Sequence, residues 1–211
     1  MNATSRLCGV ILAAGASSRM GRDKALLAWP QGGAGTFLSA AIERFIPYVD
    51  MVLVVAGRNA AALTAVVYAD GASLVVNEEP ERGQFSSLQT GLHEVLNRGR
   101  DAALITLVDR PPVKAETIEK LLEEFERALA HGKWAAVPEY GGRHGHPIMA
   151  GREMIEAFLR APATSSAREL LHAAEERIVY TPVDDPLVVA NVDTPEQYAA
   201  LGSEGAMINL K

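Results

Sequence analysis

Two cationic side chains follow a stretch of small residues near the amino terminus. Arg19 and Lys24 come shortly after this stretch, whose members are Leu12, Ala13, Ala14 and Gly15. Small residues let backbone N–H groups come close to a ligand, and successive N–H groups form an anion-binding nest. A nest followed by two fixed cations suits a triphosphate, which carries about four negative charges. We therefore expect triphosphate binding here; a glycine-rich turn with two solvated cations is the alternative.

The segment matches neither of two common phosphate-binding motifs. In the P-loop, G-x-x-x-x-G-K-[ST], the lysine directly follows the second glycine. Here Gly15 and Gly21 are one residue too far apart, and Lys24 comes three positions after Gly21. The dinucleotide-binding pattern G-x-G-x-x-G is absent from the segment too. The spacing therefore indicates a different type of phosphate-binding loop.

Two aspartates lie far apart in the sequence, each at a position suited to a metal ligand. Asp109 ends the apolar segment 104–108, and Pro111 and Pro112 stop that segment from continuing as a strand. Asp193 lies in a loop just before a candidate helix start. Two such loop carboxylates can converge on one Mg²⁺ that bridges phosphate oxygens. The alternative is that each aspartate only caps a helix or a turn.

Three further polar residues are candidates for contacts with substrate. Ser86 or Ser87 is expected to open a helix whose free N–H groups could contact a base, a ribose or an acceptor phosphate. Taken by itself, this pattern favours an ordinary serine N-cap. His146 follows a run of glycines and could touch a substrate phosphate or hydroxyl, or be structural. Asn191 could supply an oxygen ligand or hold its loop.

Strand-like and helix-like segments alternate along the chain. The strand candidates are 7–13, 51–55, 73–76, 102–108, 135–138 and 178–182. The helix candidates are 36–45, 59–68, 86–97, 114–130 and 153–160, with further helix starts at 166–169 and 194–196. This alternation predicts an α/β fold, a mostly parallel sheet covered by helices on both faces, with ligands bound at the edge where its strands end. We expect one domain over 1–205 and a short flexible tail over 206–211.

Composition narrows the class of protein. The 211 residues are 48% hydrophobic and 22% charged, as in an ordinary globular domain. A net charge of −6 argues against a general nucleic-acid binder. The single cysteine, Cys8, lies in an apolar segment and offers neither a disulfide framework nor a cysteine-based zinc site. No segment is apolar enough to span a membrane and no secretion signal is evident, so we expect a cytoplasmic protein.

In this order the motifs resemble those of the molybdenum cofactor cytidylyltransferases, a group of nucleotidyltransferases. The resemblance covers roughly residues 7–201, and its carriers are 12–24, 83–91, 109–112, 145–147 and 193–196. The related guanylyltransferases tend to begin the first motif with L-A-G-G, whereas residues 12–15 here are L-A-A-G. The resemblance implies a Rossmann-like fold of three α/β/α layers and favours CTP over GTP.

The resemblance also implies a mechanism. The loop from Leu12 to Gly15, with Ser87, holds the nucleotide, and Arg19 and Lys24 bind its phosphates, with Lys24 nearest the reacting phosphorus. Asp109 and Asp193 hold Mg²⁺. The terminal phosphate of molybdopterin attacks the α-phosphate of CTP, and pyrophosphate leaves. Lys24, Arg19 and Asp109 are then the catalytic residues.

Two positions depart from the family pattern. Arg110 stands where the family often has glutamine, and Asn191 stands where it often has aspartate. A cation beside Asp109 could bind an anionic acceptor, so Arg110 and His146 are the candidate acceptor residues. Alternatives within the fold are a guanylyltransferase and a sugar- or alditol-phosphate nucleotidyltransferase. A further alternative is a non-catalytic chaperone that hands cofactor to a molybdoenzyme or to the chaperone of that enzyme.

Overall fold

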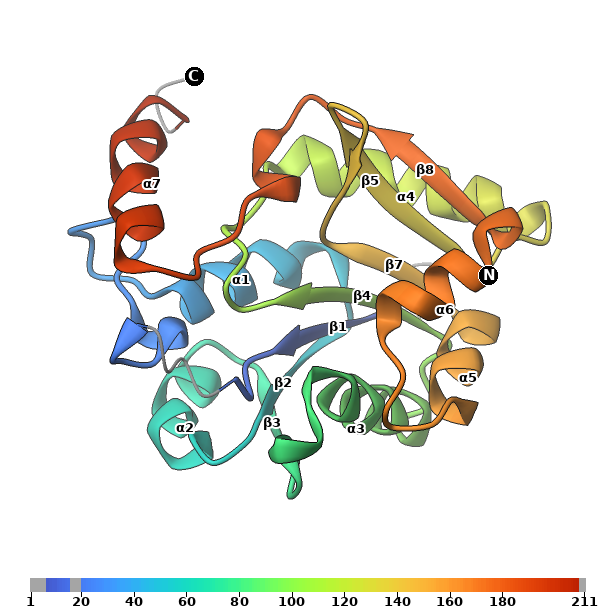
Figure 1. The fold of residues 1–211 in the computed structure, drawn as a ribbon, viewed down its shortest axis with the longest axis horizontal. Coiled ribbons are helices and arrows are strands. Elements are labelled where there is room, and N and C mark those ends of the chain that lie inside the picture. The colour runs from blue at the N-terminus through green and yellow to red at the C-terminus, as the bar shows by residue number, and fades with distance from the viewer. Residues whose placement is uncertain (1–6, 16–19, 209–211) are drawn as a thin grey trace.

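The computed structural model describes residues 7–15 and 20–208, with side chains as far as residue 201. Eight strands of this described part form one sheet, in the order β3-β2-β1-β4-β7-β5-β6, and β8 also pairs with β5 (Figure 1). The strands are β1 Leu7–Leu12, β2 Met51–Ala56, β3 Ser73–Val76, β4 Ala102–Leu107, β5 Ala135–Tyr140, β6 Arg143–His144, β7 Ile148–Gly151 and β8 Ile178–Pro182. The helices are α1 Phe37–Phe45, α2 Ala60–Ala69, α3 Gln84–Asn97, α4 Ala115–Ala130, α5 Arg152–Arg160, α6 Ala167–Ala173 and α7 Pro195–Ile208.

The sheet is mostly parallel, as predicted. Strands β3, β2, β1 and β4 pair in parallel, and so do β5 and β8. Strand β7 runs antiparallel to both β4 and β5, and β6 forms a hairpin with β5. Neither β6 nor β7 was predicted, because no strand candidate was found between residues 138 and 178. Gly141 and Gly142 turn the hairpin with φ of 57° and 72°, a conformation that glycine adopts without strain.

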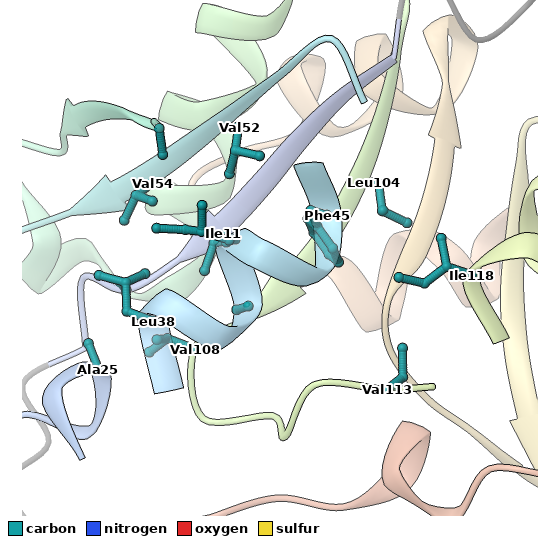
Figure 2. Packing of buried hydrophobic residues seen from close by; sticks show 14 of the residues in the cluster. Ile11, Ala25, Leu38, Phe45, Val52, Val54, Leu104, Val108, Val113 and Ile118 are labelled. Atoms are coloured by element: carbon teal, nitrogen blue, oxygen red, sulfur yellow. The ribbon is translucent and has the colours of Figure 1, made fainter. Parts of the chain in front are cut away.

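Helices cover both faces of the sheet, which gives the predicted three layers. Alternate residues of β1 supply the two cores, because successive side chains of a strand point to opposite faces. Ile11 packs on one face with α1, α2 and α4, and Figure 2 shows it beside Leu38 and Phe45 of α1. Cys8 and Val10 pack on the other face with α3 and α5, and burial raises the pKa of the Cys8 thiol to about 12.

Helix α3 lies close against the sheet at Gly91. A Cβ atom at this position would come within 2.8 Å of Val55 and 3.0 Å of Val10, so a larger residue would push the helix away. The amino-terminal end of α3 is thereby held beside the ends of β1 and β4. Among the described helices, none is long and apolar enough to cross a membrane.

Candidate active site

Three segments far apart in the sequence meet where β1 and β4 end. The Val108 N–H donates to the Leu12 carbonyl at 3.0 Å and joins the segments that follow β1 and β4. The Val192 N–H donates to the Asp109 carbonyl at 3.0 Å and brings in the loop that precedes α7. Because parallel strands end at one edge of a sheet, their loops can build one shared site there.

Lys24 lies between the two aspartates. Its Nζ is 2.7 Å from Asp193 Oδ1 and 3.3 Å from Asp109 Oδ2, although the three residues are 85 and 169 positions apart. The lysine side chain is only 11% exposed, so these interactions are weakly screened by water. The structure thus brings one predicted phosphate-binding cation and both predicted metal ligands to one place. Arg19, with residues 16–18, lies outside the described residues.

Asp109 and Asn191 each carry an oxygen atom that could bind a metal ion. Asp109 Oδ1 is buried and has no hydrogen-bond partner among the described residues. Asn191 Nδ2 donates a hydrogen bond to Asp193 Oδ2, and so orients that carboxylate, while Asn191 Oδ1 is also buried without a partner in the described part of the chain. Carboxylate and amide oxygens are the ligands that Mg²⁺ and Mn²⁺ prefer. The donor set therefore fits a hard divalent cation.

A pocket of about 170 Å³ opens beside this cluster. It is lined by Leu12, Ala14 and Gly15 after β1, by Lys24 and Asp109, and by Ser87 of α3. Ala13 does not line it: its N–H donates to Val55 and its carbonyl accepts from Asn59, at 2.8 and 2.9 Å. The pocket therefore combines small backbone-rich walls with one cation and one carboxylate, as a polyphosphate requires.

Asn59 holds the two ends of the cation-bearing loop, a role that the sequence analysis missed. Its Nδ2 donates to the Ala13 carbonyl at 2.9 Å and to Asp23 Oδ2 at 2.6 Å. Its Oδ1 accepts from the Gly57 N–H at 3.0 Å, and Asp23 Oδ1 accepts from the Ala25 N–H. The sequence only marked Asn59 as a helix start, because its partners lie far away along the chain.

Ser87 is held by a buried asparagine. Asn77, 5% exposed, donates to Ser86 Oγ at 2.9 Å and to Ser87 Oγ at 3.0 Å. The prediction that one of these serines opens the helix was wrong: α3 begins at Gln84, and Gly83 precedes it with a φ of 99° that favours glycine. Both hydroxyls therefore lie in the first turn of α3, where Ser87 faces the pocket.

The sequence also matches a known family. The model of the MobA-like NTP transferase domain matches residues 9–178. The chain belongs to this family. It is 23% identical to the molybdenum cofactor cytidylyltransferase of Escherichia coli K12, over 90% of this chain and 92% of that one. It is 28% identical to a probable molybdenum cofactor guanylyltransferase of Mycolicibacterium paratuberculosis, over 95% and 98%.

Solved structures agree with this family membership. The crystal structure of the Rv0371c protein of Mycobacterium tuberculosis H37Rv matches with a TM-score of 0.79 and 27% identity, over 95% of this chain and 98% of that one. A further crystal structure of that protein is a complex with manganese, with a TM-score of 0.75 and 26% identity over 95% and 99%. The fold is therefore the Rossmann-like α/β fold of the nucleotidyltransferases. The relatives carry both cytidylyl and guanylyl names, so membership of the MobA-like family does not select a base.

Arg110, which departs from the common family pattern, bridges the two aspartate-bearing loops. Its Nη1 donates to the Ala190 carbonyl at 2.7 Å, while its Nε is buried with no partner among the residues described. Burial lowers the pKa of Arg110, and the nearby Asp109 and Asp193 raise it in opposition. The guanidinium stays charged, since the ordinary pKa of arginine is far above neutrality.

His146 lies beside Arg110 and is neutral at physiological pH. Burial first, and then the charge of Arg110, lower the pKa of His146 to about 4. A hydrogen bond to the Ile105 backbone opposes that shift, and Nδ1 has no partner within the described residues. The backbone N–H of His146 donates to the Val188 carbonyl at 2.9 Å. His146 can therefore offer a hydrogen bond, but not a positive charge, to a substrate.

A second, larger cavity adjoins the nucleotide pocket. This groove has a volume of about 1150 Å³ and shares Leu12, Gly83, Gln84 and Leu107 with the smaller pocket. Arg110 and His146 both line it. Asp109 thus lines the smaller pocket while its neighbour Arg110 lines the groove, so a ligand in each would meet at this pair.

Proposed function

We propose that this chain transfers CMP from CTP to the terminal phosphate of molybdopterin and releases pyrophosphate. The observation that carries the proposal is the contact of Lys24 with both Asp109 and Asp193, beside a pocket walled by residues 12–15. A cation and two carboxylates at a polyphosphate-sized pocket suit phosphoryl-group chemistry. The E. coli relative named as a cytidylyltransferase supports the choice of reaction.

We assign Asp109 and Asp193 as the ligands of a divalent cation, Mg²⁺ by preference, with Asn191 as orienting residue. Within the described residues, no group of three or more His, Cys, Asp or Glu side chains could hold a metal alone. Phosphate oxygens and water would complete the ligand set, as is usual for Mg²⁺. When bound, the cation supplies charge neutralisation and orients the phosphate oxygens. The manganese complex of the mycobacterial relative supports a divalent metal.

The side chains of this protein then bind and align the reactants. Lys24 donates to the α-phosphate, Arg19 binds the remaining phosphates, and Arg110 binds the acceptor phosphate with its unpaired Nε edge. An acceptor oxygen forms a bond to the α-phosphorus, the bond to the bridging oxygen breaks, and its electron pair leaves with pyrophosphate. No protein nucleophile is required, because the acceptor phosphate is already ionised. Catalysis is alignment and electrostatic stabilisation.

The choice of CTP rests on the L-A-A-G sequence of residues 12–15. GTP is the alternative, because relatives named as guanylyltransferases are as similar to this chain. The test is pyrophosphate release from each of the four nucleoside triphosphates with molybdopterin, with Mg²⁺, with Mn²⁺ and with EDTA. We expect release with CTP in either metal and none in EDTA. Faster pyrophosphate release with GTP than with CTP would assign GTP as the substrate in place of CTP. No pyrophosphate release with any of the four nucleotides would refute the proposal.

A further inference from the structure

The groove beside the nucleotide pocket is much larger than a phosphate requires. Its volume of about 1150 Å³ reaches the size of sites that enclose whole drug-sized ligands, about 300–1,000 Å³. Arg110 accounts for only one end of it. Further lining comes from the first turns of α3, from β4, from the β5–β6 hairpin, from β8 and from the segment around α6. Most of these residues do not line the nucleotide pocket, so the size of the groove requires a separate explanation.

Two aromatic rings are stacked in the wall of the groove. The rings of His144 and Tyr180 lie 3.8 Å apart, centroid to centroid, with 8° between their planes. Both residues line the groove, and 47% of the His144 side chain is exposed. His144 comes from β6 and Tyr180 from β8, and both strands pair with β5, which fixes the two rings on one rigid platform. Such a platform suits a planar ring system.

Charge is distributed unevenly along the groove. Arg143 precedes His144 in the hairpin and lies near enough to Arg110 to affect its pKa, so positive charge runs from the catalytic edge to the aromatic pair. Beyond the pair lies a carboxylate, Glu175, which contributes to the raised pKa of Tyr180 after burial of the phenol. Glu139 lies at the ring pair itself, with its Oε2 3.4 Å from His144 Nε2. The groove therefore leads from cations, through stacked rings with one acid beside them, to the second acid, Glu175.

Glu175 is available for a ligand. The Glu175 side chain is 60% exposed, and His172 Nδ1 lies 3.7 Å from its Oε2. The other carboxylate in the groove, Glu169, is occupied, because it accepts from the Ser166 N–H in a capping box. A largely exposed carboxylate matches the adjacent 2-amino and N3–H donors of a 2-amino-4-oxopteridine.

We propose that the groove holds the pterin of the acceptor, with its ring against His144 and Tyr180 and its aminopyrimidinone edge on Glu175. The acceptor phosphate then points toward Arg110 and the nucleotide. This assignment rests on the proposed function for the identity of the acceptor. It adds the residues that distinguish a pterin phosphate from any other phosphate monoester.

The test measures binding of neopterin 3′-phosphate, a pterin with a phosphate monoester, by quenching of pterin fluorescence. The corresponding lumazine, which has oxygen in place of the 2-amino group, and glycerol 3-phosphate, which has no ring, are the comparison ligands. We expect the native protein to bind the pterin at least tenfold more tightly than either. Loss of one stacking surface in His144→Ala should weaken pterin binding about tenfold, while His93→Ala, an exposed histidine outside the groove, should change nothing.

Glu175→Gln provides a specificity readout that a general loss of structure would not mimic. It should weaken pterin binding about tenfold and leave lumazine binding unchanged, because only the pterin presents two donors to the acid. Glu176→Gln, the neighbouring acid outside the groove, is the matched control. In turnover, both groove variants should raise KM for molybdopterin and leave KM for CTP unchanged.

Equal pterin binding by native protein and both groove variants would overturn this assignment, and so would equal losses in the control variants. No measurable binding of neopterin 3′-phosphate by the native protein would overturn it too. These outcomes are separate from failure of the proposed function. If the native protein releases no pyrophosphate with molybdopterin, the proposed function is refuted. If the native protein is active but the groove variants bind the pterin as tightly as it does, only the pterin site is refuted.

Discussion

The nucleotide pocket and the groove differ in how their residues are held. The pocket lies at the ends of parallel strands, and its central lysine is 11% exposed and bound to two carboxylates. The outer part of the groove is lined by an antiparallel hairpin and a short helix, and its His144 side chain is 47% exposed. A site that must align phosphates for a displacement needs rigid, poorly hydrated charges, whereas a site that only holds one substrate tolerates open and solvated ones.

The difference between the two sites is tested most directly at Lys24, in the nucleotide pocket. We expect Lys24→Ala to lower kcat at least 10²-fold, because it removes a weakly screened cation from the charge that develops in the reaction. The measurement is pyrophosphate release at saturating CTP and acceptor. Lys120→Ala removes an exposed lysine of α4 and is the control. A Lys24→Ala variant within a few-fold of native activity would show that the pocket is not the reaction centre.

A smaller effect is expected at Asn77, which donates a hydrogen bond to the pocket residue Ser87. Asn77→Ala leaves the buried Ser86 and Ser87 hydroxyls without their donor, so the free energy of unfolding should fall by about 1–3 kcal/mol. KM for CTP should rise, because Ser87 lines the pocket. Urea denaturation and initial rates measure the two effects, and Asn97→Ala at the exposed end of α3 is the control. If the stability falls but the KM for CTP is unchanged, Asn77 stabilises the fold and does not affect nucleotide binding.

The smallest expected effect concerns His146, which lines the groove beside Arg110. Its pKa is about 4 in the folded chain, below the ordinary 6.5, so the unfolded chain binds a proton first as the pH falls. The stabilising contribution of neutral His146 is therefore present above pH 6.5 and is lost toward pH 4. Between pH 6 and 5 the free energy of unfolding should fall by up to about 1 kcal/mol more in the native protein than in His146→Asn.

Urea titrations at several pH values measure this difference, and His93→Asn, an exposed histidine, is the control. Parallel pH curves for the native protein and His146→Asn would contradict the depressed pKa. A difference restricted to His146 would sharpen the comparison, because it would show that the groove is poorly hydrated where His146 and Arg110 line it.

Much of the nucleotide half could be predicted from the sequence alone. The apolar strand that ends in small residues is a local pattern, and so is the aspartate that follows the strand 102–107. Each pattern by itself predicts a position at the edge of the sheet. Asp109 was expected at the edge where the strands of a parallel sheet end. Its approach to Asp193, which follows no strand, was expected because both are loop carboxylates and because the family resemblance implies that they share a metal ion. The family resemblance, also carried by local motifs, is confirmed by the match over residues 9–178.

Only the tertiary structure decided how these motifs are held and what lies beside them. Asn59 and Asn77 act on residues of other segments, and β6 and β7 exist because the hairpin finds pairing partners on β5 and β4. The stacking of His144 on Tyr180 joins two strands through a third. Hydrogen bonds and packing between distant segments leave no periodicity in the chain, so their effects become visible only once the chain is folded.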